Sequence, residues 1–334
     1  MMMTPEWLAH RYDEGHDAVH FVNAPRALRR SVPFLTDEHL AATDAPAIWK
    51  RSDALAGAHG ASPTHFIFHS AYCCSTLLAR AFDIPGVAHS LSEPQILNDM
   101  VGWRHRGGNP AEIGAVTDSA LRLLARPFIE GEATVIKPSN IVNGLATALL
   151  SIRPDARAVL LHAPLRLFLG SIARKGMWGR LWVRELLARQ LAEGMIDLGF
   201  ESRDYLLHTD LQAAAVGWLA QHRLFGDMAR KWPERIRTLD SEALVARPGE
   251  AMTALAGLFG VGLAETRIAS IVADVFARDS KSGKVFASGQ RAADQTAAET
   301  LHADEIDKVS SWAEAVAASA GIDMALPAPL LGPG

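Results

Sequence analysis

The chain is poor in cysteine and lacks an excess of positive charge. Among its 334 residues the cysteines are Cys73 and Cys74, which are neighbours. Neighbouring cysteines rarely form an ordinary disulfide, so the sequence predicts no disulfide framework and favours a reducing compartment. The formal net charge is −4. This value argues against a protein that binds nucleic acid through a global basic field.

The chain also lacks a long uninterrupted apolar run. Its most apolar stretch, residues 145–173, contains five charged or titratable residues, namely Arg153, Asp155, Arg157, His162 and Arg166. Such a stretch does not suit a membrane span. The first 15 residues, MMMTPEWLAHRYDEG, do not show the charged-then-apolar pattern of a signal peptide. We therefore expect a cytoplasmic protein that makes no membrane contact.

Short apolar runs alternate with helical patterns along most of the chain. Four runs predict buried strands, at residues 65–68, 134–136, 158–161 and 236–239. The helical patterns cover residues 76–82, 113–125, 145–152, 165–174, 180–198, 211–231, 248–259, 265–276 and 304–320. Strands that alternate with helices predict a parallel sheet covered by helices on both faces. The predicted fold class is therefore α/β, with three layers.

Composition divides the chain into three parts. Residues 1–62 are predicted to be an N-terminal helical extension, because Thr4-Pro5-Glu6 and Thr36-Asp37-Glu38 resemble helix starts. A glycine-bearing linker at residues 57–63 leads into the main domain, residues 63–325. Residues 326–334 are rich in proline and glycine, and we expect them to form a loose tail.

The turn after the first predicted strand is a candidate anion site. The strand at 66–68 runs into small and polar residues, and a helix is expected to begin near Ser75 and Thr76. In a parallel sheet such a turn places backbone N–H groups and a helix N-terminus at the carboxyl edge, where phosphate binds. The triphosphate-binding form G-x-x-x-x-G-K-[ST] is matched only at Thr76. An ordinary ATPase or kinase loop is thus a poor fit, and a plain capped strand–helix connection is an equal alternative.

Several segments resemble the sulfotransferase family. The run 66–78 is similar to its phosphosulfate loop, a strand followed by P-[RK]-[ST]-[GS]-[ST]-T-L-L. Here Ser75-Thr76-Leu77-Leu78 match, whereas Ala71, Tyr72, Cys73 and Cys74 replace the proline, the basic residue, the hydroxyl residue and the glycine. Further similar segments follow in the family's order: SLSEP at 90–94, VIKP at 135–138, VLLHAPLRLFLGSIARK at 159–175, RTLDSEALVARP at 237–248 and DSK at 279–281.

This resemblance implies a three-layer P-loop fold of the nucleoside-triphosphate-hydrolase type, with a central parallel sheet. It implies transfer of a sulfuryl group from 3′-phosphoadenosine-5′-phosphosulfate to a hydroxyl or amine of a small molecule or peptide, with no metal. Glu93 would be the general base, and Lys137 would stabilise the leaving phosphate. The donor would be bound by Tyr72, Cys73, Cys74, Ser75, Thr76, His162, Ser171 and Lys281.

The residues themselves leave alternatives for Glu93 and Lys137. Pro94 disfavours helix at Glu93, so an extended or turn conformation is expected there. A carboxylate in that position serves as a base if it reaches the acceptor, but it can equally cap a helix or form a salt bridge. Lys137 ends an apolar strand and so faces the edge where ligands bind. Alternatively, its aliphatic stem carries the ammonium to the surface.

Two other functions stay open at this stage. One is a nucleotide-dependent phosphotransferase on the same fold, in which Asp240 and Thr76 would hold Mg²⁺. The other is a nucleotide- or partner-binding protein without turnover, which the uncharged Tyr72 favours. A resident metal is not expected, because the histidines show neither H-E-x-x-H nor a zinc-ligand spacing. The acceptor and the oligomeric state are not indicated.

Overall fold

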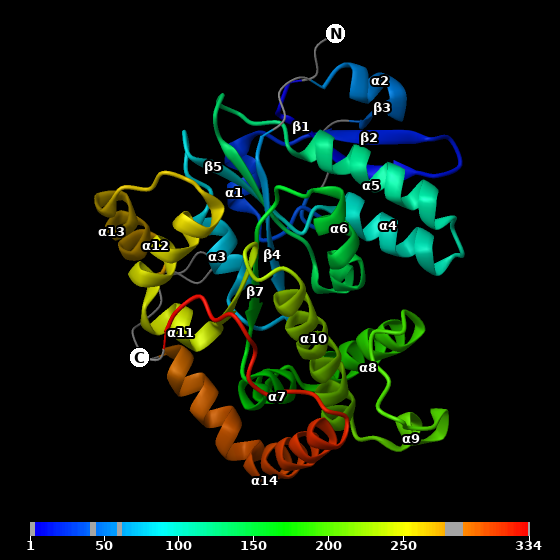
Figure 1. Ribbon diagram of the computed structural model, residues 1–334, viewed down its shortest axis with the longest axis vertical. Helices are drawn as coiled ribbons and strands as arrows, with labels where there is room; N and C mark the ends of the chain where they lie inside the picture. The colour runs from blue at the N-terminus through cyan, green and yellow to red at the C-terminus, as the bar shows by residue number, and fades with distance from the viewer. Residues whose placement is uncertain (1–3, 41–44, 59–61, 278–289, 333–334) are drawn as a thin grey trace. The chain divides into compact units, whose positions relative to one another are not determined.

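The computed structural model describes residues 4–40, 45–58, 62–277 and 290–332 (Figure 1). For residues 290–301 it describes the backbone alone. Within the described residues the strands form two sheets, in the orders β1-β2-β3 and β5-β6-β4-β7-β8. The second is a five-stranded parallel sheet flanked by helices, which confirms the predicted α/β fold class. No helix in the described ranges combines the length and the apolar character that a bilayer crossing needs.

The chain divides into two compact units. The first contains the described residues of Met1–Phe68, Ser75–Ala158 and Met252–Lys284. The second contains those of His69–Cys74, Val159–Ala251 and Val285–Gly334. The anion-binding turn predicted from the sequence belongs to the second unit, whereas the helix that follows it belongs to the first.

The N-terminal part of the first unit is a small antiparallel sheet. Its strands are β1 (Trp7–Asp13), β2 (Ala18–Asn23) and β3 (Ala47–Lys50), accompanied by the short helices α1 (Arg26–Ser31) and α2 (Arg51–Ala56). The helical extension predicted for residues 1–62 is therefore wrong, and so are the helix starts at Thr4 and Thr36. The burial of Leu8, Phe21 and their neighbours on paired strands outweighs the helix preference of the residues before Trp7.

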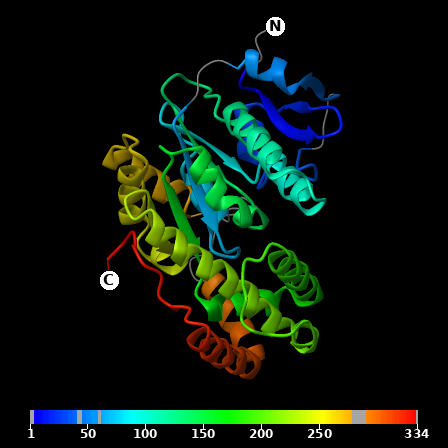
Figure 2. The ribbon, with the colours of Figure 1, turned by 45° about the vertical axis from the view of Figure 1, so that its right-hand side comes forward.

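The first unit also holds β4 (Thr64–His69) as far as Phe68, β5 (Ala88–Ser92), β6 (Ala133–Lys137) and most of their helices. β6 lies between the other two and pairs in parallel with both. The helices are α3 (Ser75–Ala81), α4 (Gln95–His105), α5 (Pro110–Leu124), η1 (Asn140–Leu145), α6 (Ala146–Ile152) and α13 (Glu265–Asp274). α4 and α5 lie side by side against β1 (Figures 1 and 2).

The second unit is mainly helical. Around β7 (Ala158–His162) and β8 (Ile236–Asp240) the chain forms α7 (Leu165–Arg174), α8 (Gly176–Ala192), α9 (Ser202–Leu207), α10 (Asp210–Lys231), α11 (Ser241–Ala246) and α14 (Gln290–Ser319). Helix α12 (Pro248–Phe259) crosses the boundary between the units. α10 is the core helix, because its buried Trp218, Leu219 and Phe225 face inward while α7, α8 and α14 contact it.

The sequence predicts a loose tail for residues 326–334; of these, the described residues 326–332 include a segment that is hydrogen-bonded to β8. The Thr238 N–H donates to the Ala328 carbonyl at 2.9 Å, and the Leu330 N–H donates to the Thr238 carbonyl at 2.8 Å. The Thr238 hydroxyl also donates to the Pro327 carbonyl at 2.8 Å. One tail carbonyl and one tail N–H therefore satisfy both backbone polar groups of Thr238.

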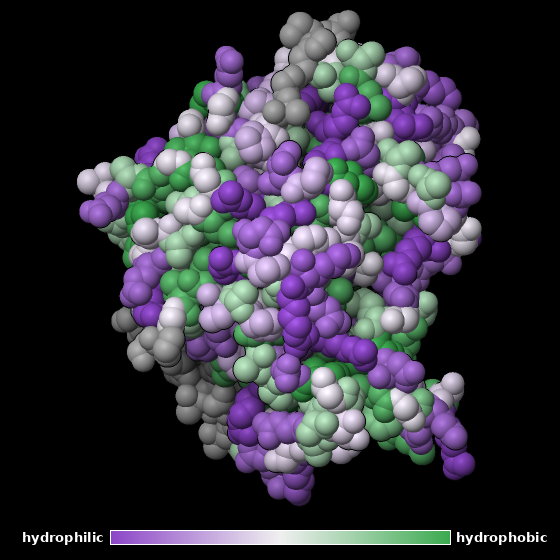
Figure 3. All heavy atoms as spheres, viewed as in Figure 1, coloured by the Kyte–Doolittle hydropathy of each residue, from purple (hydrophilic) through white to green (hydrophobic). Residues whose placement is uncertain are grey.

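Within the described residues of the second unit, neighbouring exposed apolar side chains occur at two places. They are Met177, Trp178 and Leu181 at the start of α8, and Leu206 and Leu207 at the end of α9. The face of the molecule drawn in Figure 3 otherwise mixes hydrophilic and apolar side chains. Scattered apolar residues are usual on protein surfaces and carry no functional conclusion by themselves.

Candidate functional site

The carboxyl edge of β5 and β6 brings together the two residues predicted to be catalytic. Ser92 is the register partner of Lys137, and the Glu93 N–H donates to the Lys137 carbonyl at 2.7 Å. Beyond this backbone bond, the Lys137 ammonium forms an ion pair with the Glu93 carboxylate. The positions of the two side chains therefore follow from the last residues of two adjacent parallel strands.

Burial makes this ion pair distinctive. The Lys137 side chain is 1% exposed and that of Glu93 is 17% exposed. A lysine is almost never fully buried unless it is paired, because removing a charge from water is costly. The alternative in which Lys137 reaches the surface is therefore wrong. The structure shows Glu93 in a salt bridge, which was one of the open interpretations, and its role as a base stays a prediction.

A phenylalanine from the N-terminal part completes the surroundings of Lys137. The ammonium lies 4.9 Å from the centroid of the Phe34 ring, within the range of a cation–π interaction. The next residue, Leu35, donates its N–H to the Ser92 carbonyl at 2.8 Å and accepts from the Gln95 N–H at 3.1 Å. These bonds fix the segment on both sides of Glu93. Sequence analysis missed Phe34, because no periodicity or motif distinguishes it.

The backbone of Glu93 is held in a conformation that non-glycine residues rarely adopt. Its φ is +53°, in the left-handed region. The bonds to Lys137 and the flanking bonds of Leu35 impose this geometry from both sides. Left-handed backbone costs an L-residue roughly 1–2 kcal/mol. Such strain clusters at functional sites, where the surrounding structure overrides it.

Among the described residues, three buried polar atoms without a hydrogen-bond partner belong to residues close in sequence to Glu93 or Lys137. Within the described part of the chain, Ser90 Oγ, Ser92 Oγ and Asn140 Nδ2 are buried and have no hydrogen-bond partner. Nearby in sequence, Ser139 donates its hydroxyl to Asn98 Oδ1 at 2.9 Å. Buried polar groups normally find partners, so these atoms are able to accept a hydrogen bond from, or donate one to, a water or a polar ligand. This edge of the sheet is therefore suited to a polar ligand.

The predicted donor loop, residues 69–74, has an unusual backbone. Ala71, Tyr72 and Cys74 have φ values of +69°, +53° and +63°. His69 Nδ1 accepts the Ala71 N–H at 3.1 Å, which fixes the start of the turn. Cys74 thus adopts the left-handed angles for which the family form places a glycine. Consecutive N–H groups in turns of this kind form concave nests that bind anions.

The two cysteines behave as small residues lining this loop. The Cys73 side chain is buried and that of Cys74 is partly buried, and both are thiols. A buried cysteine thiol behaves as a small apolar residue, so packing is the role that the structure shows for Cys73. After the loop, α3 begins at Ser75, and the side chains of Ser75 and Thr76 are buried in the first unit.

Tyr72 points into an aromatic cluster of the second unit. Its ring lies edge-on to Phe168 at 6.0 Å and to Trp182 at 5.6 Å, and Trp182 stacks on Trp178 at 6.4 Å. Burial raises the pKa of Tyr72 to about 12, although the Arg174 charge opposes this shift. The phenol therefore stays protonated. It is able to donate a hydrogen bond, but it carries no positive charge where the family form has one.

His162 is anchored beside the loop. Ser70 donates its N–H to the Leu161 carbonyl at 3.1 Å, and its hydroxyl accepts the Ala163 N–H at 3.2 Å. These bonds fix the residues on both sides of His162. The imidazole stacks on His222 at 5.7 Å, and burial lowers the pKa of His162 to about 4. At neutral pH His162 is therefore uncharged and offers a phosphate only a hydrogen bond.

The remaining predicted donor residues are placed as follows. Ser171 lies half-buried on α7, and Arg166 on the same helix pairs with Asp307 of α14. The charge of Arg166 is thus offset by an acid of the same unit. Lys281 lies outside the described residues. Asp240, the Mg²⁺ ligand of the kinase alternative, accepts the Glu242 N–H at 2.7 Å and caps α11.

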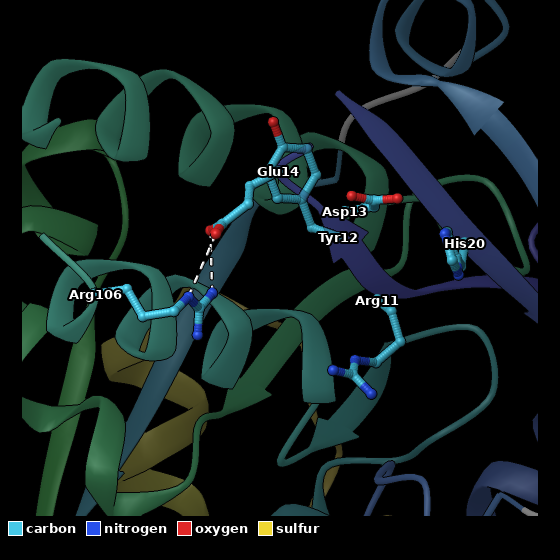
Figure 4. Close-up of a pocket in the computed structure, with 6 residues that line it drawn as sticks. All are labelled: Arg11, Tyr12, Asp13, Glu14, His20 and Arg106. Carbon is cyan, nitrogen blue, oxygen red and sulfur yellow. Dashed lines mark hydrogen bonds and ion pairs between the residues drawn. The ribbon is translucent and has the colours of Figure 1, made fainter. Parts of the chain in front are cut away.

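A separate surface pocket in the first unit carries two arginines that sequence analysis did not single out. It is lined by Arg11, Tyr12, Asp13, Glu14, His20 and Arg106 (Figure 4). Both guanidinium groups already pair with acids, Arg106 with Glu14 at 3.0 Å and Arg11 with Asp99 at 3.0 Å. Across the described ranges, no group of three or more His, Cys, Asp or Glu residues is arranged to hold a metal.

Three solved structures that resemble this chain are sulfotransferases. STF9 from Mycobacterium avium has 13% sequence identity and a TM-score of 0.44, over 77% of this chain and 79% of that chain. The sulfotransferase domain of the olefin synthase from Synechococcus PCC 7002 has 13% identity and a TM-score of 0.38, over 70% and 84%. STF1 from Mycobacterium tuberculosis H37Rv has 13% identity and a TM-score of 0.41, over 67% and 74%.

No family model matches the chain, and no curated protein matches it in sequence. The three similar structures belong to the family that the sequence segments resemble. Because their TM-scores lie below 0.5, the functional proposal rests on the residues of this chain.

Proposed function

We propose that the chain is a sulfotransferase-like enzyme that moves a sulfuryl group from 3′-phosphoadenosine-5′-phosphosulfate to a hydroxyl or amine. The observation that carries the proposal is the buried Lys137–Glu93 pair at the carboxyl edge of β6 and β5. This edge is where open parallel sheets bind their ligands. The pair supplies a cation and a carboxylate, which are the two charges that sulfuryl transfer needs.

The residues suit an anionic donor in part. The left-handed angles at Ala71, Tyr72 and Cys74 support an amide nest for a phosphosulfate, and Thr76 supplies a hydroxyl at the start of α3. Lys137 supplies a positive charge. Against this, Tyr72 is neutral where the family form has a basic residue, and burial keeps His162 uncharged as well. We therefore expect the donor to bind, but with few charged contacts.

The proposed reaction is a direct, in-line transfer. The acceptor oxygen or nitrogen forms a bond to sulfur, while the bond from sulfur to the bridging oxygen breaks and leaves its electron pair on the 5′-phosphate. Glu93 takes the proton that the acceptor loses, and Lys137 offsets the negative charge that develops on the leaving phosphate. Holding both substrates in line supplies much of the remaining rate.

The kinase alternative receives less support than sulfuryl transfer. Its loop has no lysine at the position that reaches the β- and γ-phosphates. Its Mg²⁺ candidate, Asp240, already caps α11. The non-catalytic alternative is favoured by one specific observation, the neutral and packed Tyr72. A binding protein would bind nucleotide or partner without forming product, and Glu93→Gln would not affect that binding.

We propose a small molecule or a peptide as the acceptor, and the cytoplasm as the place of action. The adjacent thiols of Cys73 and Cys74 favour a reducing compartment. Neither nucleic acid nor membrane is among the proposed partners, because the net charge is −4 and the apolar stretch 145–173 is interrupted by charges.

A thermal-shift panel tests the proposal. The protein is melted with adenosine 3′,5′-bisphosphate, with the phosphosulfate donor, with ATP and Mg²⁺, and with AMP. Stabilisation by the bisphosphate and the donor alone supports sulfuryl transfer, because a ligand that binds the native state raises its stability. Stabilisation by ATP with Mg²⁺ selects the kinase. A panel without any shift refutes both enzyme proposals.

Turnover then separates an enzyme from a binding protein. Release of adenosine 3′,5′-bisphosphate from the donor is followed with pools of phenols, alcohols and amines as acceptors. Lys137→Met is the matched variant, because Met is similar in volume to the lysine stem and lacks the charge. Product formed by the wild type and lost in this variant supports the proposal. Donor binding without product from any pool supports the non-catalytic alternative.

A further inference from the structure

The ion pair with Lys137 is at odds with a role of Glu93 as a catalytic base. To take a proton, Glu93 needs a carboxylate oxygen directed at the acceptor. In the structure, Glu93 Oε1 is bound by the Lys137 ammonium instead. The backbone bond between the same two residues, 2.7 Å long, keeps them adjacent. The base and the cation therefore occupy each other in the ligand-free chain.

Lys137 has little freedom to leave the pair unaided. With 1% of its side chain exposed, the ammonium has almost no access to water. Separating a buried charge from its partner is strongly unfavourable unless another negative group replaces it. The Phe34 ring at 4.9 Å attracts the cation but carries no charge. An incoming anion is therefore the natural replacement for the Glu93 carboxylate.

We propose that the donor's phosphosulfate displaces Glu93 from Lys137 and thereby frees Glu93 to act as the base. This inference rests on the proposed function and adds a regulatory step to the same site. Phe34 keeps the ammonium in place during the exchange, since its segment is fixed by the two backbone bonds of Leu35. The base is thus released only when the donor is present. No bond is made or broken in this step.

The proposed exchange predicts the direction in which Glu93→Gln changes ligand affinity. This variant removes the carboxylate that competes with the donor for Lys137, so adenosine 3′,5′-bisphosphate should bind more tightly than to the wild type. Coupling energies between contacting residues correspond to a change of about twofold to about 160-fold in an equilibrium constant. If Glu93 acted only as a base and did not compete with the donor for Lys137, this substitution would give no gain in affinity. The affinity is measured by titration calorimetry at fixed ionic strength.

A double-mutant cycle shows whether the gain passes through Lys137. Lys137→Met alone should weaken bisphosphate binding. In the Lys137→Met background, Glu93→Gln should leave the affinity unchanged, because no ammonium remains to be released. Glu130→Gln is the control for overall charge, since Glu130 is exposed. It should leave bisphosphate affinity unchanged in the wild-type background.

Folding is checked in each variant by its melting curve. If Glu93→Gln does not fold, Glu93→Asp replaces it; the shorter carboxylate reaches Lys137 less well, and a smaller gain in affinity is expected. Tighter binding that requires Lys137 supports the exchange. Unchanged or weaker binding by both Glu93 variants overturns it and leaves the proposed function standing. A wild type that binds neither bisphosphate nor donor overturns the proposed function, and the exchange with it.

Discussion

Replacing Cys74 by glycine tests whether the surrounding structure holds the backbone of this residue in a strained conformation. Cys74 has a φ of +63°, which costs an L-residue roughly 1–2 kcal/mol. Glycine removes this cost but adds about 0.4–1 kcal/mol of entropy to the unfolded chain. Subtracting the second range from the first leaves a net stabilisation of about 0–1.6 kcal/mol, with a central value of about 0.8 kcal/mol. Cys74→Gly should therefore raise the free energy of unfolding by this amount.

Cys74→Ala is the matched control for this prediction. Alanine removes the thiol but keeps the left-handed strain, so it separates the backbone effect from lost side-chain contacts. The two variants are compared by urea denaturation, where a shift of midpoint at constant slope reports stability. If Cys74→Gly is no more stable than Cys74→Ala, the loop is not strained at this residue and the reasoning fails.

Three further predictions concern the charges and rings of the two units. Glu93→Gln should lower stability more than Lys137→Met, because it leaves the buried Lys137 ammonium without a carboxylate. Lys137→Met instead leaves a carboxylate whose side chain is 17% exposed and so can be hydrated. Equal losses of stability in urea titrations would contradict this. Burial lowers the pKa of both His162 and His222 to about 4, so the unfolded chain binds more protons between pH 4 and 6.5 and stability should fall as pH falls through that window. His162→Phe should flatten this pH dependence in denaturation midpoints, and an unchanged slope would refute the assignment. Tyr72→Phe keeps the ring and removes the hydroxyl, so the KM for the donor should rise; an unchanged KM would remove the Tyr72 hydroxyl from donor binding.

The strands of the parallel sheet were predictable because their sequences are buried and short. The runs around Phe66, Val135 and Leu160 consist of apolar and β-branched residues, and the observed strands extend each prediction by only one or two residues. β5 was missed because Ser90 and Ser92 interrupt its apolar pattern. Its placement depends on pairing with β6, which is information that lies outside the strand itself.

The N-terminal part shows where local signals fail. The residues before Trp7 carry a hydroxyl, a proline and an acid, which favour a helix start. The chain forms a strand instead, because burial of Leu8 and Phe21 across a hairpin outweighs a capping preference of about 1 kcal/mol.

For the candidate site, the sequence indicated Glu93 and Lys137 separately. Their contact depends on β5 and β6 being neighbours, and no local pattern contains that relation. Phe34 was invisible for the same reason, since it reaches Lys137 from more than 100 residues away in the chain.

The pairing of the C-terminal tail with Thr238 has a practical meaning for handling the protein. β8 is the last strand of its sheet, and an exposed edge invites pairing with other chains. The tail covers this edge, and Pro327 and Pro329 have no N–H with which to continue a ladder. A cut after Ala325 would uncover β8 and favour self-association. Purification tags are therefore better placed at the N-terminus, and clipping of the last residues should appear first as aggregation.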